Sequence, residues 1–504
     1  MSEVPAGVKM GVASRKIRPS ATLMITRDGI DGVEVLLGRR AESMPVFPEY
    51  WAFPGGGLSR VDKLAVEELE QLTGPNAASI AAIMREVVEE LGFACNNGKI
   101  VSVDSIARNL VVEDKANWLS QVKQGNIVCD TTGIRHISSR TTPPFGPVLF
   151  ENTFLHVHGG SMGEVPQASI VGQTEFVDFE WQTAEKFLQR WQRFEMKIAP
   201  PVVTLLMQLK RTLPQFDGDM MLTAEEMERQ QIGRRSILFA YGVEVVPVKT
   251  ATLPPADHTN SYLIGDPDGD FVLVDPAARM REGMEQLATA VERHNGNLVA
   301  IVFTHPHSDH LGDFDLLREA FDVPIWGSKE TSTHISCQRI LVDGETLQLG
   351  KQKWQVLQTP GHHPGHICLL GDAGLVAGDM VAGIGTILIP PNEGDMDQYL
   401  QQLQRLIELK PHLIFPSHGP VIPLPVKKLS YYLNHRAARH QRVLDAVSNG
   451  NQSLANIAKI AYQDSPDAHP LLAQDQTLSH LLSHQRNGKV SHQDNCWEIV
   501  KKRL

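Results

Sequence analysis

The chain has 504 residues, of which 42% are hydrophobic and 21% are charged, and its formal net charge is −11 at pH 7. This balance is typical of globular domains and excludes a chain that is disordered throughout. The acidic net charge also excludes a protein coated uniformly with basic residues for nucleic acid. Since a domain takes roughly 100–200 residues, the length predicts about three domains.

Five cysteines lie far apart and form no CxxC pair, which predicts free thiols in a reducing compartment. The start of the chain contains no apolar segment of the kind found in secretory signals. No apolar run approaches the roughly 18 residues of a membrane span. We therefore expect a cytoplasmic protein, or one of an organelle matrix, that does not enter a membrane. The oligomeric state stays open.

Residues 1–211 alternate between strand and helix patterns, which predicts an α+β domain. Two strand-like runs at residues 20–28 and 33–40 flank an Asp-Gly turn, and a long helical stretch ends in residues 85–93. Residues 212–235 are polar and have no strand pattern. We interpret this segment as a linker to the next domain.

Residues 236–428 contain short β-rich runs with helices between some of them, which predicts sheets covered by helices. Residues 429–504 have the pattern of helices followed by a small hairpin at 490–500, which favours a winged-helix-like module. From Val426 to Leu504 there are 11 Lys or Arg residues and 6 Asp or Glu residues. This local excess suits a polyanion-binding surface, while a solvated basic face is the commoner interpretation.

Candidate metal ligands lie together in the motif THPHSDHLG: His305, His307, Asp309 and His310. Two histidines spaced by two at the end of a β-run point to the same side of the chain. Imidazole suits zinc, and a nearby carboxylate suits a second cation. Further residues of the right type follow later strand-like runs: His362, Asp379 and His418. Together they complete seven ligands, which is enough for two metal ions.

These motifs resemble the metallo-β-lactamase superfamily over residues 236–425. The resemblance implies an αββα sandwich that binds two Zn²⁺ or other divalent ions. It assigns the ligands as follows: one ion to His305, His307 and His362, the second to Asp309, His310 and His418, and a bridging position to Asp379. Asp275 matches a supporting carboxylate of that fold, and a plain strand-end cap is the equal alternative.

Such a cation pair lowers the pKa of a water and polarises a carbonyl or phosphoryl oxygen. The expected reaction is therefore metal-assisted hydrolysis, with Asp309 and Asp379 as catalytic carboxylates that orient the attacking hydroxide. His363 and His366 lie in the same loop as His362. His366 either touches the substrate or packs behind the ligands, and packing is the commoner case.

The superfamily resemblance leaves the substrate class open between thioesters, as in hydroxyacylglutathione hydrolases, lactams and phosphodiesters. The SHGPVI motif, the helix after it and the helical tail resemble lactamase-beta-like 2 proteins. That resemblance implies a ribonuclease acting on single-stranded RNA, whereas the alternative partner is a small-molecule thioester. Arg436 and Arg439 are candidate phosphate contacts, although exposed helix arginines are more often merely solvated.

A second candidate site lies in the string REVVEELGF at residues 85–93. Its Glu86, Glu89 and Glu90 fall on one helix face. Like charges there repel, and a hard cation such as Mg²⁺ or Mn²⁺ would offset the repulsion. Arg85 is placed to orient Glu86. A solvated acidic face is the alternative interpretation.

The same string matches the second half of the Nudix box, so the first domain resembles a Nudix hydrolase. The resemblance implies an α/β/α sandwich in which the three glutamates bind Mg²⁺ or Mn²⁺ and Glu86 and Arg85 are catalytic. It also implies a nucleoside diphosphate derivative, such as a coenzyme A derivative, as substrate. Ala77 stands where the first glutamate of the box is expected, and Asp62 or Glu67 is the candidate substitute. The alternative is a non-catalytic ligand-binding module.

Overall fold

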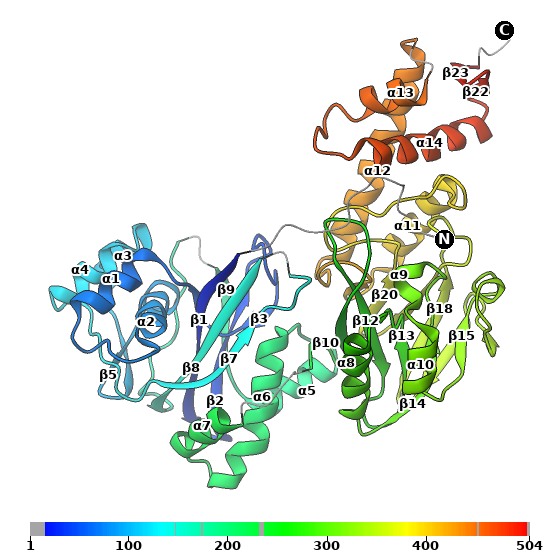
Figure 1. The fold of residues 1–504 in the computed structure, drawn as a ribbon. Helices are drawn as coiled ribbons and strands as arrows, with labels where there is room; N and C mark the ends of the chain where they lie inside the picture. Colours follow the sequence, from blue (N-terminus) through cyan, green and yellow to red (C-terminus); the bar gives the residue numbers. More distant parts are fainter. Residues whose placement is uncertain (1–15, 147, 173–174, 231–235, 451–452, 501–504) are drawn as a thin grey trace. The chain divides into compact units, whose positions relative to one another are not determined.

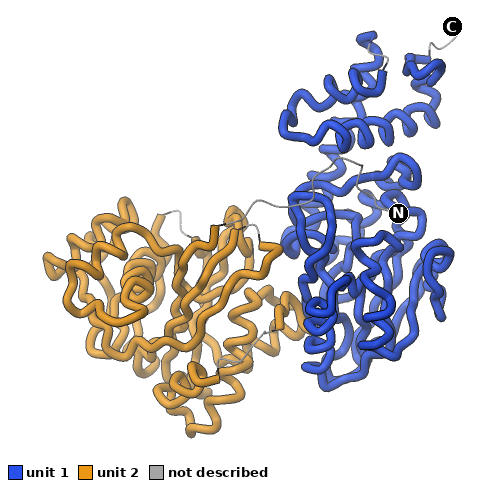
Figure 2. The backbone as a smooth tube through the Cα atoms, in the orientation of Figure 1, with its two compact units in different colours: residues 1–13, 242–504 blue, residues 14–241 orange. Residues whose placement is uncertain are grey.

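The computed structural model describes residues 16–146, 148–172, 175–230, 236–450 and 453–500. Figure 1 shows the fold of the chain in sequence colours. The chain divides into two compact units, one formed from residues 14–241 and the other from residues 242–504 (Figure 2). Within the described residues, no helix has both the length and the apolar character that a membrane crossing requires.

The N-terminal unit is built on one mixed sheet, in which β3, β2, β1, β8 and β7 are neighbours in that order, β4 pairs with β1, and β9 pairs with β2. The strands are β1 (Ile17–Gly29), β2 (Gly32–Arg40), β3 (Trp51–Ala52), β4 (Gly55–Gly57), β7 (Arg135–Thr141), β8 (Leu149–Ser161) and β9 (Phe176–Thr183). β1 and β8 run parallel along most of their length. They form the centre of the sheet on which the helices pack.

Helices lie on both sides of this sheet, with α2 on one side and α5 and α6 on the other (Figure 1). The remaining elements are α1 (Arg60–Glu68), α2 (Ala77–Leu91), β5 (Phe93–Asn96), β6 (Lys99–Ser102), α3 (Ser105–Glu113), α4 (Asn117–Lys123), α5 (Ala184–Gln192), α6 (Pro200–Thr212) and β10 (Leu238–Ala240). α2 buries Ala81, Val87 and Leu91 in the core beside β1. It ends at Gly92, whose φ of 75° is the left-handed conformation that glycine adopts without strain.

The predicted linker at residues 212–235 is wrong for most of its length. The structure has a 3₁₀ turn, η1 (Leu213–Phe216), and a helix, α7 (Met220–Arg229), which contacts β7 and α6. The side chain of Asp219 caps α7, and Met220 and Met227 are buried. Met220, Ala224 and Met227 of its buried face do have helical spacing, but the polar residues around them led to the interpretation as a linker. Residues 231–235 lie outside the described residues.

The C-terminal unit contains two sheets that pack against each other, as expected for the αββα arrangement. One has the order β11-β12-β13-β14-β15-β16 and the other β17-β18-β19-β20-β21. Tyr262 of β12 packs on Phe415 of β21, with ring centroids 5.8 Å apart. The strands are β11 (Val243–Lys249), β12 (His258–Gly265), β13 (Asp270–Val274), β14 (Asn297–Val302), β15 (Ile325–Gly327), β16 (Arg339–Ile340), β17 (Thr346–Leu349), β18 (Gln352–Gln358), β19 (Ile367–Gly371), β20 (Gly374–Gly378) and β21 (Ile414–Pro416).

Helices cover the outer face of each sheet. They are α8 (Arg281–Glu292), α10 (Phe314–Ala320), α11 (Met396–Leu409) and α12 (Pro425–Ser448). A short helix, α9 (Ser308–Leu311), follows β14, and a 3₁₀ turn, η2 (Thr331–Thr333), follows β15. α8 and α10 share a core with the first sheet, through Leu287 and Leu317. α11 and the first half of α12 share a core with the second sheet, through Tyr399 and Leu429.

The tail continues from α12 into α13 (Leu454–Ala461), α14 (Pro470–Arg486) and a hairpin of β22 (Val490–Gln493) and β23 (Cys496–Ile499). Val443 of α12, Leu481 of α14 and Trp497 of β23 share a separate core. The boundary expected between residues 428 and 429 therefore falls inside one continuous helix, which contributes to both cores. We call α12 to β23 the tail module.

We expect Met227→Ala to destabilise the N-terminal unit because α7 is part of its core. Met227 is fully buried, and truncating such a side chain costs about 2–5 kcal/mol. Met221→Ala on the same helix is the matched control, because Met221 is 38% exposed. Urea unfolding of the full chain checks this difference. Equal unfolding midpoints for the two variants would show that α7 does not stabilise the unit.

Candidate metal centre

The seven predicted ligands all follow strands of the C-terminal unit. His305 and His307 follow β14, Asp309 and His310 lie in α9, and the others follow β18, β20 and β21. Six of the seven are buried, and the side chain of Asp309 is 12% exposed. Strands from both sheets thus deliver ligands to one place, although the ligands span more than a hundred positions of the chain.

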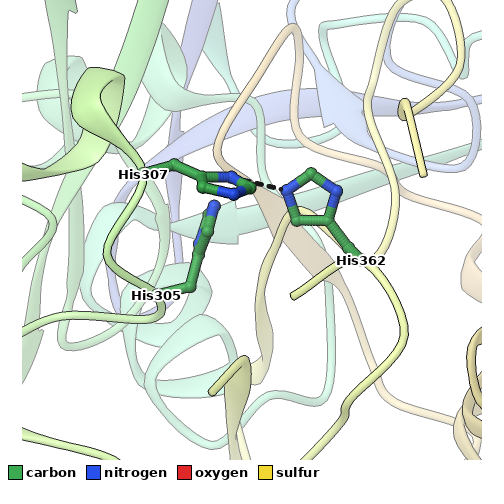
Figure 3. Close-up of side chains that lie close together, drawn as sticks. All are labelled: His305, His307 and His362. Atoms are coloured by element: carbon green, nitrogen blue, oxygen red, sulfur yellow. Dashed lines mark hydrogen bonds between the residues drawn. The ribbon is translucent and has the colours of Figure 1, made fainter. Parts of the chain in front are cut away.

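Three histidines form the first close group. Nitrogen atoms of His305, His307 and His362 all lie within 4.8 Å of one another. Figure 3 shows their rings converging, with His362 Nε2 2.9 Å from His307 Nδ1. Three imidazoles at this spacing can contribute one nitrogen each to a single divalent ion.

A second group lies beside the first. Asp309, His310 and His418 each place a ligand atom within 4.8 Å of the other two. Asp379 faces both groups: its Oδ1 lies 3.4 Å from His418 Nε2, and its Oδ2 lies 3.6 Å from His362 Nε2. One carboxylate with an oxygen toward each group has the placement that a bridging ligand requires.

Buried polar atoms at this centre fit a pair of divalent cations. His305 Nε2, His310 Nε2 and Asp379 Oδ1 are buried, and none forms a hydrogen bond with any described residue. Leaving a buried polar atom unbonded costs about 1–3 kcal/mol. A cation at each group would satisfy these atoms, so the residues present suit the metals that the sequence predicts.

Hydrogen bonds on the other ring atom orient each histidine. His310 Nδ1 lies 2.9 Å from Asp275 Oδ2, His362 Nδ1 2.7 Å from the Leu388 carbonyl, and His418 Nδ1 3.1 Å from the His258 carbonyl. A ring that donates from Nδ1 keeps the lone pair of Nε2 for a metal. These contacts therefore fix which nitrogen faces the centre.

Asp275 contacts a candidate ligand in addition to capping the end of a strand. Besides contacting His310, its carboxylate accepts hydrogen bonds from the Thr304 backbone N–H at 2.8 Å and the Thr304 hydroxyl at 2.7 Å. Of the two interpretations that the sequence left open, the supporting role is the one with a direct contact to a candidate ligand.

Glu393 was not found from the sequence. Its Oε1 lies 3.0 Å from His307 Nε2, on the ring atom opposite the one that faces His362. Glu393 lies in the loop after β20, and no motif marks it. Its proximity to His307 comes from the fold alone.

Charge and burial set the protonation of these groups. Burial lowers the pKa of His362 to about 3, and the neighbouring His307 adds to the effect. Burial likewise lowers the pKa of His305 well below its usual range. Burial raises the pKa of Asp379, but His418 and His310 outweigh it and hold that pKa well below the usual range. For His305, His362 and Asp379 these shifts favour the neutral imidazole and the ionised carboxylate, which are the forms that bind metals.

His366 packs behind the ligands. One ring nitrogen lies 2.7 Å from the Thr359 hydroxyl, and the other accepts a hydrogen bond of 2.9 Å from the Asp379 backbone N–H. Both nitrogens are thus engaged with the protein. A Cβ at Gly378 would lie 2.4 Å from the His366 ring, so a side chain at this position would displace it.

A cavity of about 220 Å³ opens onto the centre. Asp309, His362, Asp379 and His418 line one side of it. Much of the remaining wall is apolar, with Leu253, Ile384 and Ile387 among its residues. Arg279 also lines the cavity, and its guanidinium donates to the Ser308 carbonyl at 2.7 Å.

The second candidate site lies on α2 of the N-terminal unit. Arg85 is buried, and its guanidinium forms ion pairs with Asp62, Glu86 and Glu89 at 2.8–2.9 Å. Asp62 is fully buried against Arg85, whereas Glu67 is exposed. Of the two carboxylates that the sequence offered as substitutes for the residue at Ala77, Asp62 is the one that forms an ion pair with Arg85.

Glycines bring the preceding loop close to these glutamates. The Gly55 backbone N–H donates to Glu90 Oε2 at 3.1 Å, and a Cβ at Gly56 would lie 2.2 Å from Glu86 Oε1. Burial raises the pKa of Glu86 to about 7 and that of Glu90 well above its usual range. Among the described residues, however, these glutamates form no group of three within 4.8 Å, as the histidines do.

The prediction that Arg436 and Arg439 contact a phosphate is wrong. Both side chains are almost completely buried, at 2% and 3% exposed. The Arg436 guanidinium donates to the Ile387 carbonyl, and that of Arg439 pairs with Asp464 at 2.7 Å. The charge pattern of α12 does not reveal that neighbouring segments of the unit cover this face.

Fold and site together define a hydrolase with a buried centre of histidines and aspartates. The Metallo-beta-lactamase superfamily model matches residues 254–418. A "Beta-lactamase-like protein 2 homolog" of Caenorhabditis elegans is 30% identical over 43% of this chain and 74% of its own length. A hydroxyacylglutathione hydrolase of Vibrio cholerae is 31% identical over 31% of this chain and 60% of its own length. The chain belongs to the metallo-beta-lactamase superfamily and is a metal-dependent hydrolase.

The chain also has a similarity to a solved Nudix hydrolase from Alicyclobacillus acidocaldarius. The two are 23% identical, with a TM-score of 0.37, and the match covers 44% of this chain and all of the other. A superposition at this level does not establish a shared function.

We expect Asp275→Asn to weaken metal binding at the group that contains His310. The substitution removes the charge that faces His310 Nδ1, and partners of this kind typically contribute 10–100-fold to metal affinity. Competition with a chromophoric chelator measures the affinity. Asp315→Asn, at an exposed position of α10, is the matched control. If Asp275→Asn binds metal with unchanged affinity, Asp275 only caps the end of its strand.

Proposed function

We propose that this protein hydrolyses thioesters at a pair of zinc ions. In this proposal one ion is held by His305, His307 and His362, the other by Asp309, His310 and His418, and Asp379 bridges them. The observation that carries the proposal is the convergence of these buried side chains around ligand atoms that lack hydrogen bonds to described residues. When bound, such a cation pair lowers the pKa of a water and polarises the oxygen of the bond to be cleaved.

The side chains of the centre position the reactants. Asp309 and Asp379 both line the cavity, so each carboxylate can accept a hydrogen bond from an attacking water and orient it. The apolar wall that includes Leu253, Ile384 and Ile387 excludes bulk water from the reacting bond. The same wall suits the hydrocarbon part of an acyl group.

The lining of the cavity favours a thioester over a phosphodiester chain. Among the described residues, Arg279 is the one Lys or Arg side chain that lines it. Nucleic acids are usually bound through several Lys and Arg contacts to successive phosphates. The exposed Arg279 at the cavity suits a carboxylate on the thiol part of a substrate, and the similar Vibrio protein is a hydroxyacylglutathione hydrolase.

We expect S-acyl glutathione to be cleaved by the zinc-loaded protein and His307→Ala to reduce cleavage to background. His492→Ala, at an exposed position of the hairpin, is the control and should keep full activity. Metal content is quantified for each variant, and a single-stranded RNA oligomer is assayed in parallel. RNA cleavage that is lost in His307→Ala, without thioester cleavage in the wild type, would overturn the thioester proposal in favour of the ribonuclease.

We also propose that the N-terminal unit is a second hydrolytic head of the Nudix type, which uses Mg²⁺ or Mn²⁺ and cleaves nucleoside diphosphate derivatives. The ion pair between Asp62 and Arg85 favours it, because Asp62 supplies the carboxylate that is missing at Ala77. A cation beside Glu86, Glu89 and Glu90 would lower their raised pKa values and stabilise their ionised forms.

We expect Mg²⁺- or Mn²⁺-dependent hydrolysis of coenzyme A or a related nucleoside diphosphate, and a decrease in kcat of about 100-fold or more in Glu89→Gln. Glu67→Gln on α1 is the matched control, because Glu67 is exposed. Product release is followed by chromatography, and ligand binding by calorimetry. Binding without hydrolysis in the wild type would make this unit a ligand-binding module.

The five cysteines are free thiols in the structure. Unpaired cysteines are usual in reducing compartments, and they support a cytoplasmic location as part of this proposal.

A further inference from the structure

The loop after Asp379 passes directly behind two candidate ligands. We call residues 384–395 the backing loop. Its Leu388 carbonyl lies 2.7 Å from His362 Nδ1, and its Glu393 carboxylate lies 3.0 Å from His307 Nε2. Both histidines belong to the same group of three. The orientation of two of the three imidazoles therefore depends on where this loop lies.

Side chains of the tail module hold the backing loop on both sides of Leu388. On the side before it, the Arg436 guanidinium of α12 donates to the Ile387 carbonyl. On the side after it, Gln476 of α14 accepts from the Ile389 N–H at 3.3 Å and donates to the Ile389 carbonyl at 3.0 Å.

Two further contacts complete this arrangement. The hydroxyl of Ser479 donates to the Ile389 carbonyl at 2.6 Å, and Arg436 donates to Gln476 Oε1 at 2.7 Å. Arg436, Gln476 and Ser479 are all buried. The peptide groups that flank Leu388 thus have fixed partners, and those partners come from helices of the tail module.

The far end of the backing loop is held in the same way. Arg486 of α14 pairs with Asp395 and with Asp397, each at 2.9 Å. The Asp395 backbone N–H donates to the Gly361 carbonyl at 2.7 Å, directly before His362. α14 is therefore connected to the segment that carries His362 in two ways. One connection runs through Ile389 and the Leu388 carbonyl, and the other through Asp395 and the Gly361 carbonyl.

The physical consequence concerns the direction of the His362 ring. An imidazole binds a metal only when its lone pair points at the ion, and the hydrogen bond on the other nitrogen sets that direction. If Gln476 is removed, the N–H and carbonyl of Ile389 each lose a partner in a buried place, which costs free energy unless the backbone moves. Movement of Ile389 displaces the adjoining Leu388 carbonyl and with it the ring.

We propose that the tail module is a positioning element of the metal centre, with Gln476 and Arg436 acting through the Leu388 carbonyl to orient His362 toward its cation. This inference rests on the proposed metal function of the centre. It assigns a role to the tail module that is independent of which substrate the centre cleaves.

The test is a zinc titration of metal-free full-length protein in competition with a chromophoric chelator. We expect Gln476→Ala to weaken one of the two zinc affinities by about 10-fold, the lower end of the range for direct orienting partners, and to leave the other unchanged. The visible spectrum of the Co²⁺-loaded variant should change for one ion only. Excess zinc should restore hydrolysis, which loss of the fold would not permit.

Gln474→Ala is the matched control. Gln474 lies two residues earlier on α14, and its side chain forms no hydrogen bond with any described residue. If Gln476→Ala does not fold, Ser479→Ala replaces it, since it removes one donor to the same Ile389 carbonyl, and a smaller loss of affinity for one ion is expected. Wild-type protein that binds no zinc would refute the proposed function itself. Two zinc affinities that are unchanged in the variant would overturn only the positioning role.

Discussion

The C-terminal unit depends on one constraint, which is that a polar atom taken out of water must be bonded to something. Nitrogens of His305 and His310 and an oxygen of Asp379 are enclosed without a hydrogen bond to any described residue. On the opposite side of its ring, His310 is held by Asp275. Hydrogen bonds to the protein thus orient the ligand side chains. The ligand atoms that face the centre remain available to bind cations. A bound ion would interact with these atoms and so offset the free energy cost of burying them without hydrogen bonds.

The place of this cluster between two sheets explains how a hydrolytic centre is kept rigid. Ligands follow β14 of the first sheet and β18, β20 and β21 of the second, so ions bound there would cross-link the sheets. Ile384 and Ile387 of the apolar cavity wall lie in the loop that follows β20, as Asp379 does. The carboxylates of the centre and the apolar wall of the cavity are consequently positioned by one framework, which keeps their relative geometry constant.

Much of the centre could be predicted from the sequence because its ligands are of unusual types in short motifs at strand ends. The groups that contact these ligands and orient them could not be predicted. The Leu388 carbonyl is a backbone atom that any residue supplies, and Glu393 reaches His307 only through the path of its loop. Arg436 was misinterpreted because the charge of a helix residue does not reveal what covers it. The helix α7 was missed because a few apolar residues, such as Met227, suffice to anchor a short helix.

The continuity of α12 has a consequence for how this half of the chain unfolds. Leu429 belongs to the core of the second sheet, and Val443 belongs to the core of the tail, yet one uninterrupted helix carries both. Melting of the tail would fray the helix toward the catalytic sheet, so the two cores are coupled in a single cooperative transition. A protease cut between them would leave Leu429 on a truncated helix and weaken the enzyme, instead of releasing two intact pieces.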